Sequence, residues 1–315
     1  MTGYPHFLMY RPEVDVLAQV LESLRLRGSV YCRSTLATPW RLRFETHSCA
    51  VFHVVEHGTA TLEFEDERQS HLEAGDFVLC TRGQAHWLSD PRSTVGARVP
   101  RIVMRDADPY RDEVWCSSTP DAVLLCGTFT LASSASHAIL SLLPDVVHIP
   151  RQVWLERITE LMRSEVQDAR PGLETVLRRL AETLFVQVLR HHLEHAERVS
   201  GWLGGLREPR IARVLEAMHN APHEAWTVAS LARTANLSRS AFALLFTRTT
   251  GEAPLEYLTR WRMNLAQQML EARVPLPEVA ARNGYASEVA FHRAFKRTTG
   301  RTPGAVKRPS PRAPR

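Results

Sequence analysis

Cysteine thiols are the side chains in this sequence best suited to redox chemistry. The chain has five of them, an odd number without a CxxC pair: Cys32, Cys49, Cys80, Cys116 and Cys126. This spacing argues against a disulfide framework and against a zinc finger. A thiol that reacts with oxidants needs exposure and a neighbouring cation that lowers its pKa, and Cys32 is followed by Arg33. Two interpretations stay open: redox sensing through Cys32 or Cys126, and plain packing of the thiols in a core.

Basic residues gather in the C-terminal third of the chain. Residues 205–315 contain 18 Lys and Arg against 8 Asp and Glu, a net charge of +10, whereas residues 1–204 carry a net charge of −5. A basic segment joined to a mildly acidic one is typical of proteins that bind a polyanion, and nucleic acid is the first candidate. The alternative is a solvated arginine-rich surface without a partner.

Length and composition limit the number and the class of the domains that must position these groups. A chain of 315 residues predicts two domains. Its 44% hydrophobic and 23% charged residues predict globular domains rather than a disordered chain. No apolar run approaches the roughly 20 residues needed to cross a bilayer, and the first residues do not form a signal peptide. We therefore expect a cytoplasmic protein that makes no membrane contact.

Residues 29–131 predict short β-strands separated by turn signals such as His57-Gly58. The candidate strands are Val30–Arg33, Ala50–Glu56, Thr59–Phe64, Phe77–Cys80 and Ala122–Leu131. Short strands at this spacing are typical of a sandwich or a barrel. Residues 91–120 are polar and irregular, and we expect a long surface loop there.

After Pro150 the hydrophobic period becomes helical. Val153, Ile158 and Leu161 form one apolar stripe. A second, stronger stripe consists of Leu173, Val176, Leu177, Leu180, Leu184, Val188 and Leu189. Such stripes fill a core or form a dimer interface, and both interpretations stay open for residues 151–200. The glycines of residues 201–205 predict a break in the helix and a domain boundary before Pro209.

The C-terminal third contains an internal repeat with an offset of 49 residues. The pattern Ser-x3-Phe-x3-Phe-x4-Gly-x2-Pro begins at Ser238 and again at Ser287. Each copy predicts a short helix, a tight turn at Asn236 or Gly284, and a second helix with the serine as its N-cap. Residues 255–272 predict a linking helix of about 27 Å, which sets the two second helices about one DNA turn apart. Two helix-turn-helix units in a strongly basic segment predict DNA binding, and the alternative is a helical bundle with chance similarity.

This tandem arrangement resembles the DNA-binding domain of the AraC/XylS family of transcription regulators. The matching pieces are Ala280-x3-Gly284-Tyr285-x5-Phe291-x3-Phe295, Trp226-Thr227-Val228 and Trp261-Arg262-Met263. The resemblance covers residues 207–308 and implies an all-α domain of seven helices with two helix-turn-helix motifs. Residues 309–315 are then a basic tail, which we expect to be disordered.

The resemblance also assigns roles to the exposed positions of the two second helices. The base-facing residues that it implies are Arg239, Ser240, Ala243, Leu244, Glu288, Val289, His292 and Arg293. Arg293 can bond bidentately to guanine, whereas Ala243 and Leu244 leave readout to thymine methyl groups and groove shape, or make it weak. The phosphate contacts that we expect are Arg248, Arg260, Lys296 and Arg297, together with Arg239.

Residues 29–131 resemble the cupin-type sensor domain of one branch of this family, which includes regulators that respond to reactive chlorine species, and we expect the sensor domain to cover residues 1–150. The matching pieces are Thr38-Pro39-Trp40, Phe52-His53-Val54-Val55-Glu56-His57-Gly58, Leu72-Glu73-Ala74-Gly75-Asp76, Arg82-Gly83-x2-His86 and Cys126-Gly127. The resemblance implies a cupin-like β-barrel followed by helices. Cupin enzymes hold a metal through a His-x-His pattern that this chain lacks. The corresponding residues are His53, His57 and His86, which suit zinc, copper or iron, and the alternative is that His53 and His86 only line the barrel or pair with backbone.

Together these features predict an α+β protein with two domains that acts as a sequence-specific regulator of transcription and is not an enzyme. Its N-terminal domain is expected to sense a small molecule, a metal or an oxidant. The expected partners are double-stranded DNA, a second copy of the chain in a homodimer, and RNA polymerase for an activator. Two competing classes are a metal-dependent isomerase or oxygenase and a non-specific architectural DNA binder.

Overall fold

The computed structural model describes residues 15–24, 26–47, 49–92, 112–115, 120–131 and 140–307. The chain forms two compact units, one of residues 24–199 and one of residues 1–23 together with residues 200–315. Each unit is treated separately below. None of the described helices is both long and apolar enough to cross a membrane.

The first unit contains two β-sheets. Its strands are β1 (Leu26–Leu36), β2 (Arg41–Phe44), β3 (Ala50–His57), β4 (Thr59–Phe64), β5 (Gln69–Glu73), β6 (Phe77–Cys80), β7 (His86–Ser89), β8 (Asp112–Trp115), β9 (Ala122–Leu131) and β10 (Val146–Ile149). The larger sheet has the order β10-β6-β3-β9-β1-β8, and the smaller has the order β2-β7-β4-β5. Neighbouring strands are antiparallel except β1 and β8.

The two sheets do not close into the barrel that the sequence predicts. Among the described residues, no ladder joins an edge strand of one sheet to an edge strand of the other. The arrangement is therefore an open two-sheet sandwich. The expected loop over residues 91–120 also contains β8, while residues 93–111 and 116–119, including Cys116, lie outside the described residues.

The core of the sandwich lies between the sheets, where alternate residues of both sheets meet. Leu36 and Leu124 of the larger sheet and Phe44, Leu62 and Leu88 of the smaller belong to one buried cluster. β3 is buried on both faces, because helices cover the outer face of the larger sheet. This double burial explains why β3 is a run of apolar residues rather than an alternating one.

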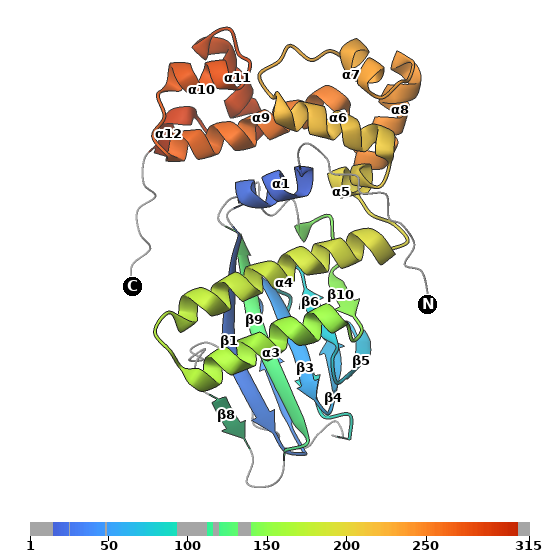
Figure 1. Ribbon diagram of the computed structural model, residues 1–315, viewed down its shortest axis with the longest axis vertical. Coiled ribbons are helices and arrows are strands. Elements are labelled where there is room, and N and C mark those ends of the chain that lie inside the picture. The colour runs from blue at the N-terminus through green and yellow to red at the C-terminus, as the bar shows by residue number, and fades with distance from the viewer. Residues whose placement is uncertain are drawn as a thin grey trace, which may run out of the picture. The chain divides into compact units, whose positions relative to one another are not determined.

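The helices on this outer face are α3 (Val153–Asp168) and α4 (Leu173–His195), which run across the sheet in Figure 1. α4 packs through Phe185, whose ring lies 4.9 Å from that of Phe129 on β9. The buried side chains of α3 are Leu155, Thr159 and Met162. The stripe predicted through Val153 and Leu161 is thus not core, because these two side chains are 63% and 47% exposed.

The second unit is helical among its described residues. Its helices are α1 (Val16–Leu24), α5 (Gly201–Leu206), α6 (Pro209–Asn220), α7 (Val228–Thr234), α8 (Arg239–Thr250), α9 (Pro254–Glu271), α10 (Leu276–Arg282), α11 (Glu288–Thr299) and α12 (Pro303–Lys307). The predicted break in the helix lies at residues 196–200, between α4 and α5, and the glycine-rich residues 201–205 themselves form α5. Gly205 is closely packed there, since a Cβ atom would lie 2.9 Å from Leu215 Cδ1.

The 49-residue repeat forms two similar helix pairs, α7 with α8 and α10 with α11. Asn236 and Gly284 occupy the turns with φ of 54° and 76°, the left-handed region expected for them. Ser238 and Ser287 cap the second helices, because their hydroxyls accept hydrogen bonds from the amides of Ala241 and Ala290. The repeated phenylalanines, Phe242, Phe246, Phe291 and Phe295, are fully buried.

Candidate functional site

The exposed faces of α8 and α11 lie opposite their buried phenylalanines. Leu244 is two residues from both Phe242 and Phe246, so at 100° per residue it points away from the core. It is 72% exposed, and Val289 on α11 is 62% exposed. Ala243 is half-buried. The other base-facing residues implied by the resemblance are exposed as well: Arg239, Ser240, Glu288, His292 and Arg293.

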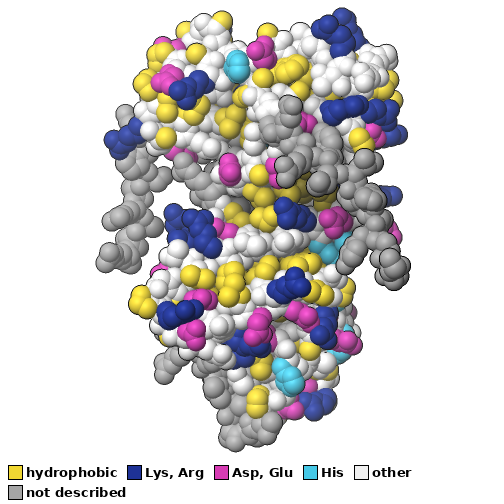
Figure 2. All heavy atoms as spheres, in the orientation of Figure 1, with side chains coloured by type: hydrophobic (Ala, Val, Ile, Leu, Met, Phe, Trp, Pro, Cys, Tyr) yellow, Lys and Arg dark blue, Asp and Glu magenta, His cyan; other side chains and the backbone are white. Residues whose placement is uncertain are grey.

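Most of the expected phosphate contacts are exposed on the same helices. Arg248, Lys296 and Arg297 are exposed, and no carboxylate among the described residues lies within 4 Å of their cationic groups. Basic side chains gather over α7 and α8 in Figure 2. Arg260 differs from the expectation, because its guanidinium is paired with Glu252 and lies over the ring of Tyr257. This pairing makes Arg260 the least available of the five cations.

A contact that the sequence did not predict joins the two helix pairs. Arg262 of α9 donates hydrogen bonds to the carbonyls of Pro222 (2.6 Å) and Glu224 (2.7 Å) in the segment before α7. The turn before α11 approaches the same segment, since a Cβ atom on Gly284 would lie 2.6 Å from the His223 carbonyl oxygen. These contacts fix the position of one helix pair relative to the other.

A buried aromatic group connects α6 to α9. The His219 ring stacks on Trp261 with centroids 3.9 Å apart, and its Nε2 hydrogen-bonds the Tyr257 hydroxyl at 2.7 Å. Burial lowers the pKa of His219 to about 3. The imidazole is therefore neutral in the folded protein at pH values where a solvated histidine is charged.

The free energy of unfolding of the helical unit is expected to fall as pH decreases from about 6.5 toward 3. Between the ordinary pKa of 6.5 and the folded value of about 3, only the unfolded state binds the proton. Acid therefore favours unfolding, by at most about tenfold per pH unit for one group. Denaturant titrations of the full chain and of His219→Gln over this range measure the effect. An identical pH dependence in the two proteins would contradict this assignment.

In the sandwich, three cross-strand neighbours form a row on the inner face of the larger sheet. His53 of β3 is the register partner of Cys126 on β9, and Cys126 is the register partner of Cys32 on β1. His53 Nδ1 lies 3.0 Å from Cys126 Sγ. Its Nε2 lies 2.8 Å from Nε2 of His86 on β7, so this contact joins the two sheets.

Burial controls the chemistry of this row. Cys32, Cys126, His53 and His86 are each at most 1% exposed. Desolvation lowers the pKa of His53 well below its ordinary value and that of His86 to about 4, so both imidazoles are neutral. Desolvation and a hydrogen bond to Cys32 raise the pKa of the Cys126 thiol well above its ordinary value. The Cys126 thiol is thus neutral, and both thiols are shielded from solvent, which slows their reaction with oxidants.

Arg33, the predicted activator of Cys32, is paired with Glu56 at 2.8 Å. Successive residues of a strand point to opposite faces, which separates the Arg33 guanidinium from the thiol.

The three histidines proposed as metal ligands do not come together. His53 and His86 are paired in the core, whereas His57 is exposed at the end of β3. Within the described part of the chain, no group of three or more His, Cys, Asp and Glu side chains is arranged to hold a metal ion. His86 Nδ1 is also engaged, at 2.8 Å from the Gln84 carbonyl oxygen. The residues present therefore do not fit the cupin metal centre, and they match the alternative in which His53 and His86 pair inside the sandwich.

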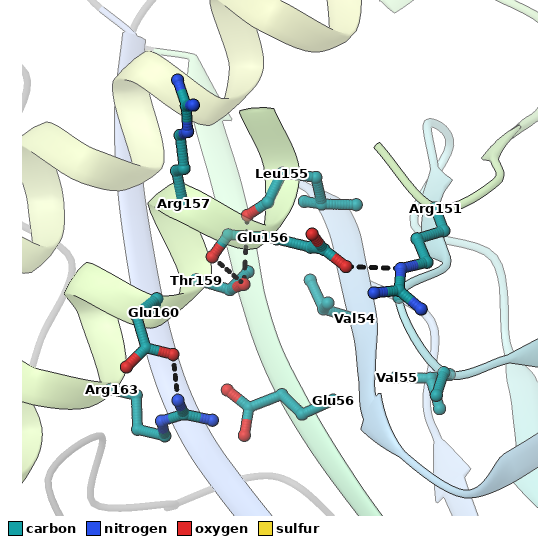
Figure 3. A pocket seen from close by; sticks show the side chains of 12 residues that line it. Val54, Val55, Glu56, Arg151, Leu155, Glu156, Arg157, Thr159, Glu160 and Arg163 are labelled. Carbon is teal, nitrogen blue, oxygen red and sulfur yellow. Dashed lines mark hydrogen bonds and ion pairs between the residues drawn. The ribbon is translucent and has the colours of Figure 1, made fainter. Parts of the chain in front are cut away.

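A cavity of about 470 Å³ lies between β3 and α3 (Figure 3). Its lining includes Val54, Val55 and Glu56 from β3 and Leu155, Glu156, Thr159, Glu160 and Arg163 from α3. Arg151 pairs with Glu156 and Arg163 pairs with Glu160, while Glu56 extends toward Arg163 in the same view. The lining is thus a set of paired charges around an apolar floor, in a place that the sequence did not indicate.

Comparison with known families matches both parts of the chain. Residues 15–194, more than half of the chain, match the family described as Cupin. Residues 231–309 match the family described as Helix-turn-helix domain, which spans α7 to α12.

Known proteins share this organisation over nearly the whole chain. A Streptomyces lividans protein, named as an AraC-like transcription regulator, is 35% identical over 298 residues, which cover 92% of this chain and 97% of that protein. The RCS-specific HTH-type transcriptional activator RclR of Escherichia coli is 30% identical, with 92% and 96% covered. Among solved structures, the DNA-binding domain of AdpA in complex with a target DNA is 37% identical over 30% of this chain and 87% of that chain, with a TM-score of 0.30.

Proposed function

The chain belongs to the AraC-type family of DNA-binding transcriptional regulators with an N-terminal cupin domain, and from this membership we propose how its two units divide the work. The relatives are named as transcription regulators, and this chain is likewise a regulator and not an enzyme. We propose that α7–α8 and α10–α11 act as two helix-turn-helix motifs that insert α8 and α11 into successive major grooves of double-stranded DNA.

The observation that carries this proposal is the sidedness of α8 and α11. Each has fully buried phenylalanines on one face and exposed cations and polar groups on the other. The cations are not neutralised by carboxylates of the described residues, so they are available to phosphates. The base-facing set and the phosphate set given above are proposed on this ground, with Arg260 removed from the phosphate set.

Salt dependence of duplex binding tests this function. We expect the full chain to bind the intergenic DNA beside its own gene with an affinity that drops steeply as salt rises, because phosphate contacts release counterions. Footprinting locates the site, and unrelated duplex DNA serves as competitor. A flat salt response would contradict the proposal. Equal competition by unrelated DNA would instead favour an architectural binder.

For the sensor we propose that Cys32 and Cys126 respond to strong oxidants. Their adjacency on neighbouring strands supports a disulfide between them. Burial slows the reaction of both thiols, so weak oxidants are excluded. The second candidate input is a small molecule bound in the cavity between β3 and α3. Such a ligand would contact α3, the helix whose exposed side chains we assign below to a dimer interface.

We also propose that the exposed apolar side chains of α3, Val153 and Leu161, lie in the interface of a homodimer.

The domain boundaries that we propose are those expected from the sequence: a sensor over residues 1–150, a dimer segment over 151–200 and a DNA-binding domain over 207–308. The tail over 309–315 lies outside the described residues. Activation through RNA polymerase stays part of the proposal, as the name of the E. coli relative states activation for that protein.

A further inference from the structure

The repeat differs in its two copies at the four positions that the resemblance assigns to bases, whereas the exposed Arg248 recurs as Arg297. Positions that build the motif recur, among them the capping serines and the buried phenylalanines. The outward positions pair as Arg239 with Glu288, Ser240 with Val289, Ala243 with His292 and Leu244 with Arg293. The scaffold and one exposed arginine are thus repeated, while the side chains at the four base-facing positions are not.

Each second helix exposes one large apolar side chain on its outward face. Leu244 lies in the second turn of α8 and Val289 in the first turn of α11. An exposed arginine follows each at four residues, Arg248 and Arg293, so it lies on the same face one turn later. A partner that covers these side chains removes apolar surface from water, which favours its binding.

The surroundings of these two side chains indicate which partner covers them. Neither belongs to a continuous patch of large apolar side chains, which a protein partner would require, because their outward neighbours are polar, basic or alanine. A duplex matches this mixture. In the major groove the only apolar group on a base pair edge is the thymine 5-methyl, and phosphates lie beside it.

We propose that Leu244 and Val289 are specificity-determining residues that each contact a thymine methyl group. This rests on the proposed insertion of α8 and α11 into the major groove. Because the two side chains occupy different turns, the two thymines take different places within their half-sites. Arg293, one turn beyond Val289, is then next to a second base of the same half-site.

Uracil substitution tests this inference, since deoxyuridine differs from thymidine only by the methyl group. Duplexes are first selected from random sequence with the full chain. Each thymine of the selected site is then replaced singly by deoxyuridine, and affinity is measured by fluorescence anisotropy. We expect one thymine in each half-site whose replacement weakens binding by about fourfold, the effect of one methyl-sized apolar group.

Two variants assign each thymine to its side chain. Leu244→Ala should make one of the two positions insensitive to uracil and leave the other sensitive, and Val289→Ala should do the reverse. Both side chains are exposed, so both variants should fold, which circular dichroism checks. Unchanged affinity for every uracil duplex, or sensitivity that persists in both variants, would overturn the inference. A chain that binds no selected duplex would contradict the proposed function itself.

Discussion

Arg293→Ala is expected to weaken binding to the selected operator by about 10- to 100-fold and to relax the preference for guanine at one position. The side chain is exposed at the centre of the outward face of α11, and it has no carboxylate partner among the described residues. A bidentate contact between arginine and guanine discriminates against other bases by roughly 1–3 kcal/mol. Anisotropy titrations against operator duplexes that differ at each G·C pair measure both effects.

Lys296→Ala is the matched control, because Lys296 is exposed on the same helix but is assigned to a phosphate. We expect this variant to weaken binding to all duplexes alike and to reduce the salt slope by about one unit. If Arg293→Ala instead weakens all duplexes equally, Arg293 is a phosphate contact and the base assignment is wrong.

The outward positions of α8 and α11 could be read from the sequence because the repeat aligns two copies of one motif. Residues common to both copies include Ser238 and Ser287, which the structure shows as N-caps, and the phenylalanines, which it buries. α7 (Val228–Thr234) is the short helix expected before the turn at Asn236. Local capping and turn preferences decide these features, so short stretches of sequence contain the information.

Other features depend on contacts between distant residues. In the sequence Arg260 and Arg248 look alike, because each is an arginine of the basic C-terminal segment. Only the ion pair between Arg260 and Glu252, seen in the structure, distinguishes them. The histidine pattern likewise did not reveal that His57 ends β3 at the surface while His53 faces Cys126. α3 has apolar residues on more than one face, so its sequence does not fix the buried face, and the predicted stripe through Val153 proved to be exposed. Sheet register, which brings Cys32, Cys126 and His53 into one row, is set by pairings across many residues.

Cys126→Ser is expected to abolish the response of DNA binding to hypochlorous acid. The proposal predicts that, in the unmodified chain, a Cys126–Cys32 disulfide forms as the two thiols lose two electrons and two protons, while hypochlorous acid is reduced to chloride and water. Cross-linking β9 to β1 changes the sandwich core, which also contacts β7 through His53 and His86. Operator affinity before and after stoichiometric oxidant, together with mass spectrometry of labelled thiols, measures the outcome.

Cys49→Ser is the matched control, because Cys49 is a half-buried cysteine of the same unit that lies outside the row. Partial burial also raises the pKa of Cys49, so its thiol is neutral like that of Cys126. The two cysteines therefore differ in their neighbours and not in their ionisation. We expect Cys49→Ser to respond to oxidant as the unmodified chain does, and Cys32→Ser to behave like Cys126→Ser. A response that survives in Cys126→Ser would place the sensing chemistry elsewhere, whereas a response lost in Cys49→Ser as well would show that the core thiols are not a distinct pair.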